Sequence, residues 1–158
     1  MKPTVYIETT VVSYLMAWPS RNVLRLSHEM LTRQWWTHQR SCFELYISQA
    51  VLDEASAGDP VAAAERIEAL HGITVLPIDD RVIDLARQLA KSIALPKRAL
   101  GDSLHMAATA VHGVAYLLTW NCRHMANAVL ADRISLTCER NGYIPPRIVT
   151  PEQLISLR

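Results

Sequence analysis

The chain has 158 residues, half of them hydrophobic, so it is long and apolar enough to form one domain with a sizeable core. Charged residues make up 20% of the sequence and the formal net charge is +1. The chain is therefore neither strongly basic nor strongly acidic overall, and this balance leaves both nucleic-acid and small-molecule partners open. Three cysteines, odd in number and without metal-like spacing, exclude a disulfide framework and predict a reducing, cytoplasmic location.

No apolar segment is long enough to span a membrane, and the first strand-like run begins at once, without a signal region before it. The sequence also contains no repeat, linker or low-complexity segment. We therefore expect a single domain over residues 1–158 and no membrane partner. The absence of a glycine-rich phosphate loop argues against a nucleotide cofactor.

Five short β-rich runs alternate with helical patterns along the chain. We expect strands at residues 4–7, 43–47, 73–76, 115–119 and 147–149. We expect helices at about residues 9–16, 21–40, 49–57, 60–71, 80–93, 102–112, 123–140 and 151–157. The candidate helix caps are Thr9 or Thr10, Ser20, Ser48, and Asp79 or Asp80. This alternation predicts an α/β fold in which a parallel sheet is covered by helices on both faces.

The segment from Ala99 to Asn121 organises the rest of the chain. Its pattern predicts a helix that begins near Asp102 and stops at Gly113, followed by a short buried strand that ends near Thr119. A helix that packs antiparallel to the strand after it begins at the edge where that strand ends. We therefore expect Asp102 and Asn121 to lie close together, at the edge of an open α/β sheet where ligands bind.

Two further acids are expected at the same edge. Glu8 directly follows the first strand. Glu54 lies about 9 Å along the helix after the second strand, on the face that continues from Ala50 and Val51. Its neighbour Asp53 is turned away by about 100°. The predicted fold therefore brings together four oxygen donors, from Glu8, Glu54, Asp102 and Asn121.

Carboxylates at close range repel one another and raise each other's pKa unless a cation lies between them. Oxygen ligands of this kind suit Mg²⁺ or Mn²⁺. Such a metal can activate a water molecule and neutralise the charge that builds on a phosphate in the transition state, so no side-chain nucleophile is needed. We therefore expect metal-dependent phosphodiester hydrolysis, with Glu8, Glu54 and Asp102 as the metal ligands.

Four motifs occur in the order, and with the spacing, of a PIN domain: YIETTVVSYL at 6–15, VLDE at 51–54, GDSLHMAA at 101–108 and LLTWN at 117–121. Over nearly its whole length the chain resembles prokaryotic PIN-domain proteins of the VapC toxin type. The resemblance implies a three-layer α/β/α fold, Mg²⁺ or Mn²⁺, and endoribonuclease activity as the toxin of a type II toxin–antitoxin pair. It also implies a homodimer, and an antitoxin that inserts a segment into the active-site groove.

Two positions depart from the pattern of this family. PIN domains usually carry Asp after the first strand, whereas this chain has Glu8, whose additional methylene changes its reach. The fourth acidic position is Asn121, which can ligate a metal through its carbonyl or orient a water but adds no charge. We expect one tightly held metal rather than two. The departures also leave open an alternative, a catalytically weakened PIN-like module that binds RNA or a partner protein.

Several residues beside the acids are candidates for binding RNA phosphates. Thr9 and Thr10 offer backbone N–H groups and hydroxyls at a helix start. Thr119, at the end of the fourth strand, is expected to orient groups at the site. The basic residues expected to flank the groove are Lys97, Arg98, Arg123 and His124.

These residues also have purely structural interpretations. Asp102 and Asn121 can act only as helix caps. His105, one turn after Asp102, fits a satisfied core histidine, or one that lies behind a metal ligand and orients it, better than a metal ligand itself. Trp35 and Trp36 are expected in the core or at a dimer surface. An acid cluster of this kind also occurs in other α/β enzymes, so a phosphatase and a DNA flap nuclease remain alternatives.

Overall fold

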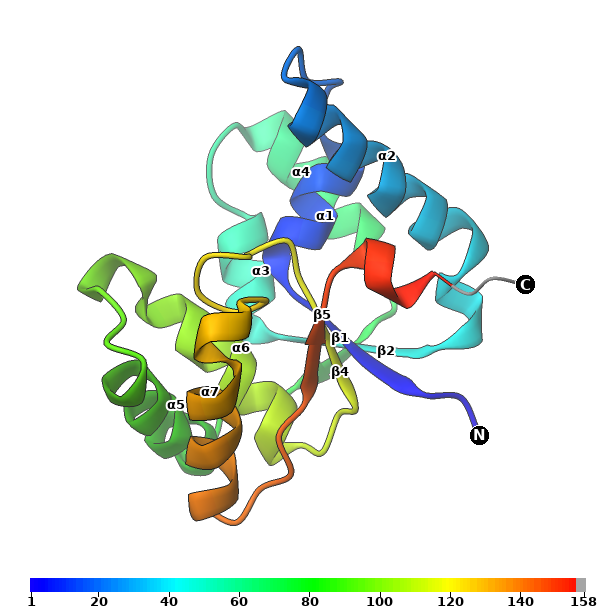
Figure 1. Ribbon diagram of the computed structural model, residues 1–158. Coiled ribbons are helices and arrows are strands. Elements are labelled where there is room, and N and C mark those ends of the chain that lie inside the picture. The colour runs from blue at the N-terminus through cyan, green and yellow to red at the C-terminus, as the bar shows by residue number, and fades with distance from the viewer. Residues whose placement is uncertain (156–158) are drawn as a thin grey trace.

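The computed structural model describes residues 1–155, which form a parallel β-sheet of five strands between two groups of helices (Figure 1). The strands are β1 Thr4–Ile7, β2 Glu44–Ser48, β3 Thr74–Leu76, β4 Tyr116–Leu118 and β5 Arg147–Val149. The helices are α1 Thr9–Met16, α2 Val23–His38, α3 Gln49–Ala55, α4 Pro60–Ala69, α5 Asp80–Ser92, α6 Leu100–Val111 and α7 Ala128–Arg140. Three short 3₁₀ segments are η1 Arg40–Cys42, η2 Lys97–Ala99 and η3 Pro151–Leu154.

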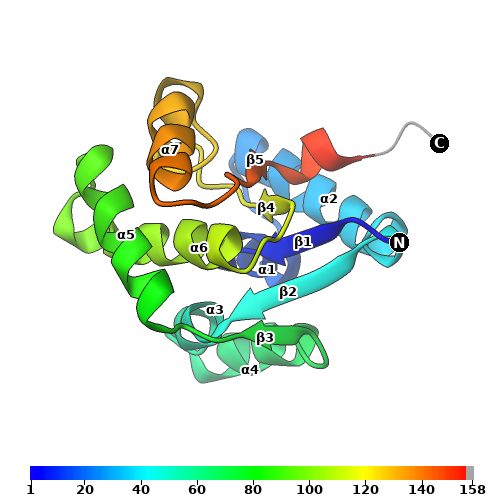
Figure 2. The same cartoon turned by 90° about the horizontal axis from the view of Figure 1, so that it is seen from below.

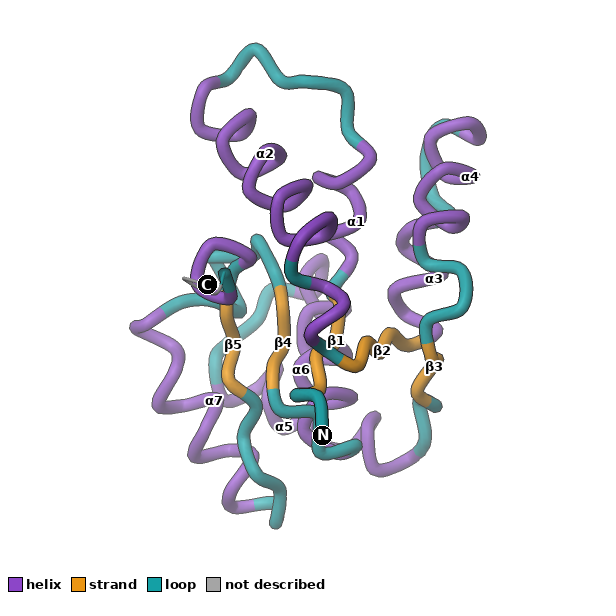
Figure 3. Tube along the Cα trace, turned by 90° about the vertical axis from the view of Figure 1, so that its right-hand side faces the viewer, coloured by secondary structure: helices purple, strands orange, loops and turns teal. Residues whose placement is uncertain are grey.

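The strands lie in the order β3-β2-β1-β4-β5, as Figure 3 shows edge to edge. β1 is the central strand, and it pairs with β2 on one side and with β4 on the other. Its residues Val5, Tyr6 and Ile7 are fully buried, which is typical of a parallel strand covered on both faces. The predicted fold class, a three-layer PIN-like α/β/α sandwich, is confirmed.

Two helix groups cover the sheet. Helix α5 packs against both α6 and α7, and the three lie together on one side, as Figure 2 shows, whereas α1 contacts α2, α3 and α4. The core between these layers includes Ile47 from β2, Leu117 from β4 and Met106 from α6. No helix within the described residues is long and apolar enough to cross a membrane.

The helix caps differ from the sequence prediction at two helices and agree with it at a third. Glu8, rather than Thr9 or Thr10, caps α1, because its carboxylate accepts the backbone N–H of Thr10. Asn22 caps α2 in place of Ser20. Asp79 caps α5, in agreement with one of the two predicted residues.

The other corrections concern element ends and two helix caps. Ser48 stands at the N-cap position of α3, but its side chain makes no capping hydrogen bond. Asp102 does not cap α6 either, because the helix begins two residues earlier. Helix α7 begins at Ala128 instead of residue 123, since turns occupy the segment after Asn121. The predicted last helix is a 3₁₀ segment, and residues 156 and 157 of that prediction lie outside the described residues.

The chain reverses its direction of progress across the sheet between β1 and β4. After β1 it moves outward to β2 and β3, and it then returns to place β4 on the opposite side of β1. Such a reversal opens a crevice at the carboxyl ends of the two strands, where open α/β sheets bind ligands. Glu8 directly follows β1 and Thr119 directly follows β4, so both lie at this crevice.

Candidate active site

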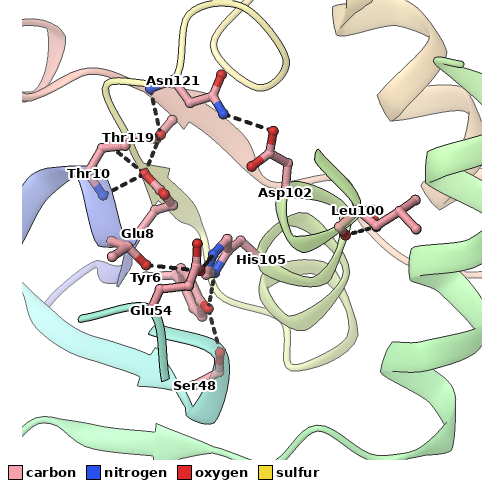
Figure 4. A network of polar contacts seen from close by, with 12 residues as sticks. Tyr6, Glu8, Thr10, Ser48, Glu54, Leu100, Asp102, His105, Thr119 and Asn121 are labelled. Carbon is pink, nitrogen blue, oxygen red and sulfur yellow. Dashed lines mark hydrogen bonds and ion pairs between the residues drawn. The ribbon is translucent and has the colours of Figure 1, made fainter. Parts of the chain in front are cut away.

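Glu8 is held at the end of β1 by hydroxyl and backbone donors (Figure 4). Its Oε2 accepts hydrogen bonds from the Thr119 hydroxyl at 2.7 Å, from the Thr10 backbone N–H at 3.1 Å and from the Thr10 hydroxyl. Each hydroxyl also accepts a backbone N–H: Thr10 from Trp120 and Thr119 from Asn121, both at 2.9 Å. The two threonines therefore join the start of α1 to the chain after β4.

Burial dominates the acidity of Glu8. The residue is only 3% exposed, and this loss of solvent raises the pKa of its carboxyl group. The charge of His105 and the hydrogen bonds from Thr10 and Thr119 lower the pKa in return, but they do not offset burial. Glu8 is therefore easier to protonate than a carboxyl group in water.

Glu54 points toward the same site from α3, as its helix face predicted. Its Oε1 accepts a hydrogen bond from the Thr9 hydroxyl at 3.1 Å and another from Nε2 of His105. Burial acts to raise the pKa of Glu54, but the hydrogen bond and charge of His105 outweigh it, so the pKa is lowered. The neighbouring Asp53 is exposed and bonded to Gln49 on its own helix, as expected for the rival acid.

His105 is fully buried in α6, one turn beyond Asp102, and its two ring nitrogens are both engaged. Nε2 meets Glu54, and Nδ1 lies 2.8 Å from the hydroxyl of Tyr6. Burial acts to lower the pKa of His105, but the hydrogen bond to Glu54 and the charges of Glu8, Glu54 and Asp102 raise it overall. All three predicted metal ligands therefore influence this one imidazole.

Asp102 and Asn121 lie together, as the sequence predicted from the packing of α6 on β4. The Asn121 side-chain N–H donates to Asp102 Oδ2 at 3.0 Å. Nδ1 of His124 donates to the same oxygen at 2.8 Å. The amide oxygen of Asn121 accepts a hydrogen bond from the backbone N–H of His124 at 2.9 Å. Asn121 therefore closes a turn and also holds Asp102 in place.

The three carboxylates share one pattern. In each, the hydrogen bonds from described residues all fall on a single oxygen: Oε2 of Glu8, Oε1 of Glu54 and Oδ2 of Asp102. The second oxygen of each carboxylate receives no hydrogen bond from these residues. Metal-binding carboxylates are commonly oriented in this way, with one oxygen held by the protein and the other left for the cation.

The donor set suits a hard divalent cation, since it consists of carboxylate oxygens. Within residues 1–155, however, no three His, Cys, Asp or Glu side chains are gathered closely enough to form a finished metal site. The reason lies in the contacts above: Glu54 is turned toward His105, and Asp102 toward His124 and Asn121. Glu8, Glu54 and Asp102 are therefore three carboxylates at this edge of the sheet, each held by partners of its own.

The predicted phosphate-binding residues fall into two groups. The hydroxyls of Thr9, Thr10 and Thr119 all donate to carboxylates in this structure, so they position the acids. The basic side chains of Lys97, Arg98 and Arg123 are exposed. Lys97 and Arg98 lie in η2, just before α6, and Arg123 lies in the turn after Asn121.

Sequence reasoning gave too small a part to four residues of the site. His124 was expected only at RNA phosphates, and it binds Asp102. His105 was expected in the core or behind a metal ligand, and it is buried and binds Glu54 without having been assigned to that acid. Tyr6 received no role, and Ser48 only that of a helix cap. The available signal was position alone: His105 lies one turn after Asp102, and Ser48 ends the strand beside β1.

The fold and its acidic crevice define the structural class of the protein. It is an α/β/α sandwich of the PIN-like type, with carboxylates at the point between β1 and β4 where the strand order reverses. A chain in the crystal structure of VapBC2 from Rickettsia felis, bound to a DNA fragment from their promoter, has a similar fold. The TM-score is 0.54 at 11% sequence identity, and the match covers 93% of this chain and 98% of that chain.

A chain in the structure of FitAB bound to an IR36 DNA fragment is similar as well, with a TM-score of 0.58 at 13% identity. This match covers 98% of the present chain and all of the other. At such low identity the likeness concerns the fold, and at that level it confirms the predicted resemblance to VapC-type PIN domains. No family model matches the sequence. No curated protein matches it either.

Proposed function

We propose that this protein is a metal-dependent endoribonuclease that acts as the toxin of a type II toxin–antitoxin pair. The observation that carries the proposal is the shared pattern of Glu8, Glu54 and Asp102. Each has one oxygen held by the protein and one oxygen that receives no hydrogen bond from the described part of the chain, at the crevice between β1 and β4. The full-length fold similarity to chains of the VapBC2 and FitAB complexes supports the toxin assignment.

Glu8, Glu54 and Asp102 would hold Mg²⁺ or Mn²⁺. When bound, such a cation supplies an activated water molecule and neutralises charge on the phosphate. The remaining work falls to side chains of the chain itself. Thr10 and Thr119 orient Glu8, and His105 and Thr9 orient Glu54. Asn121 and His124 orient Asp102.

Three exposed basic side chains supply a route for RNA. Lys97 and Arg98 lie just before α6, the helix that carries Asp102. Arg123 lies shortly after Asn121, which donates a hydrogen bond to Asp102. Cations on both sides of the acids can hold phosphates of a strand whose scissile bond lies between them. The partners that follow from the proposal are an RNA substrate, a cognate antitoxin and a second copy of the chain, in the cytoplasm.

The two tryptophans of α2 were expected in the core or at a dimer surface. Trp35 is fully buried in the core, and Trp36 packs partly buried against it. The first of these two alternatives is confirmed for Trp35. The homodimer is therefore proposed from the resemblance alone.

The first experiment is Mn²⁺ titration by calorimetry of the wild-type protein and of Asp102→Asn. We expect saturable binding in the wild type and none in the variant. Asp84→Asn is the matched control, because Asp84 is an exposed acid on α5 that pairs with Arg87 at 3.8 Å. RNA cleavage in Mg²⁺ or Mn²⁺ should follow the same order. RNA cleavage that survives Asp102→Asn would contradict the proposal.

A second function is favoured by the separate engagement of the acids. Because Glu54 and Asp102 are held by histidines and no finished metal site exists within residues 1–155, a non-catalytic PIN-like module that binds RNA or protein is the alternative. This module predicts saturable RNA binding without turnover in either metal. A folded wild-type protein that binds no Mn²⁺ would favour it.

A further inference from the structure

We propose that Ser48, Tyr6 and His105 form a buried relay whose role is to fix one oxygen of Glu54, so that its second oxygen faces the cation. The relay rests on the proposed function, because it assigns positioning residues to that same site. None of the three contacts substrate or metal in this scheme. They act through Glu54, the carboxylate at the end of the relay.

The contacts of the relay run without interruption from β2 through β1 and α6 to Glu54 in α3 (Figure 4). The Tyr6 hydroxyl, from β1, lies 2.6 Å from Oγ of Ser48 at the end of β2 and 2.8 Å from Nδ1 of His105 in α6. Nε2 of His105 then meets Oε1 of Glu54 in α3. Ser48, Tyr6 and His105 are each fully buried, so no water competes for the hydrogen bonds among these three residues.

The direction of the last hydrogen bond is fixed by chemistry. An ionised carboxylate has no proton to give, so Nε2 of His105 must carry the proton that it shares with Glu54. If the ring is neutral, Nδ1 accepts from Tyr6, and Ser48 donates to the Tyr6 oxygen. If the ring is charged, Nδ1 donates to Tyr6, which then donates to Ser48. The two hydroxyls serve both states, and Nε2 keeps its proton toward Glu54 in either one.

Ser48 provides an independent sign that the relay has a purpose beyond packing. It occupies the N-cap position of α3, where serine is a favoured residue because its hydroxyl can accept a helix N–H. Its side chain makes no such hydrogen bond and is turned toward Tyr6 instead. A local preference is thus given up for a tertiary contact, which is expected where a site imposes its own geometry.

The test compares Mn²⁺ affinity in Tyr6→Phe and Ser48→Ala with that of the wild type, at a temperature where all are folded. Tyr6→Phe removes one hydroxyl and keeps the buried ring, and we expect about a tenfold loss of affinity, typical of residues that orient metal ligands. Tyr46→Phe is the matched control. It removes a tyrosine hydroxyl that donates to Glu44 at 2.7 Å, at the exposed start of β2.

A second pair of variants separates positioning from packing. His105→Gln keeps a side-chain N–H donor for Glu54, whereas His105→Leu does not. We expect His105→Gln to retain more Mn²⁺ affinity than His105→Leu, even where the two have similar thermal stability. Unchanged Mn²⁺ affinity in a folded Tyr6→Phe variant would overturn the relay, as would equal affinities for the two His105 variants.

A metal-free measurement distinguishes failure of the relay from failure of the nuclease proposal. The proton on Nε2 of His105 is buried and hydrogen-bonded, so it should give a slowly exchanging downfield signal in the proton NMR spectrum. We expect the signal in the wild type and in Tyr46→Phe, and faster exchange of the same proton in Tyr6→Phe, because the ring is no longer held at Nδ1. If the wild type binds no Mn²⁺, the proposed function fails and this exchange rate alone decides. An unchanged exchange rate in Tyr6→Phe would reject the relay.

Discussion

Glu8 and Glu54 lie at the same edge of the sheet, but their surroundings treat the same carboxyl group in opposite ways. Glu8 is buried, and the hydrogen bonds that it receives from residues 1–155 all come from neutral donors, two hydroxyls and one backbone N–H. Glu54 has a side chain that is 45% exposed and is bound by the buried His105. The pKa of Glu8 is raised by burial, whereas the pKa of Glu54 is lowered by His105 in spite of its partial burial.

The difference shows that the free-energy cost of an ionised carboxylate in this site falls mainly on Glu8. Neutral hydroxyls orient Glu8 without cancelling its charge, so an ionised Glu8 is costly until a cation arrives. His105 can cancel the charge of Glu54, so ionised Glu54 is stabilised without a cation. On the proposed function, Glu8 therefore gains most from metal binding, and Glu54 must be shared between the cation and His105.

Removal of a hydroxyl donor from Glu8 should have the largest effect on stability. In Thr119→Val the buried carboxylate loses a hydrogen bond of 2.7 Å, and the Asn121 backbone N–H loses its acceptor. We expect the free energy of unfolding to fall by about 1–3 kcal/mol, measured by urea denaturation. Thr137→Val is the control, because its hydroxyl hydrogen-bonds with the Arg133 carbonyl oxygen and with the Ser92 hydroxyl, neither of which is a carboxylate. Equal losses in the two variants would contradict the prediction that removing a donor from the buried carboxylate of Glu8 costs more free energy than removing a hydrogen bond elsewhere.

Glu8→Gln should make the metal-free protein more stable near neutral pH. Because the folded pKa lies above the ordinary value of 4.5, the stability that protonated Glu8 contributes is complete below that value and is lost as pH rises through the folded pKa. Glutamine removes this loss. We expect a Tm increase of about 2–4 °C at pH 7 that shrinks toward pH 4. A decrease at pH 7 would mean that burial does not dominate at Glu8.

Glu54→Gln should have the opposite sign and a smaller size. The lowered pKa of Glu54 gives a contribution to stability that is present above its ordinary value of 4.5 and lost as pH falls through the folded pKa. Its partial exposure screens the interaction with His105. We expect a slight drop in Tm at pH 7, measured by calorimetry in EDTA, and no difference at low pH. A rise in Tm at pH 7 would remove the contrast with Glu8.

Much of the arrangement follows from patterns along the chain. The first and last predicted strands, at Thr4–Ile7 and Arg147–Val149, have the same bounds in the structure, and the other three strands overlap their predicted positions. Alternation of strands and helices requires parallel crossovers, so the layered fold could be predicted. The closeness of Asp102 and Asn121 followed from the antiparallel packing of α6 on β4.

The caps and the hydrogen-bond partners of the acids were beyond reach from the sequence. Serine, threonine, asparagine and aspartate all cap helices, so local rules could not choose Asn22 over Ser20, or Glu8 over Thr9 and Thr10. The start of α7 was misplaced for a related reason. Asn121 closes a turn with His124 before the helix can begin, and helical periodicity does not register such a turn.

The sequence by itself determined the layered sheet, the order of its elements and the acids at the edge of the sheet, because these depend on periodicity and on the position of each residue at a strand end. The tertiary structure alone decided which donor holds each acid. His105 reaches Glu54 across 51 positions of the chain and Tyr6 across 99. Such contacts depend on strand register and helix packing, which no local pattern encodes. The relay beneath Glu54 became visible only once three separate elements were packed together.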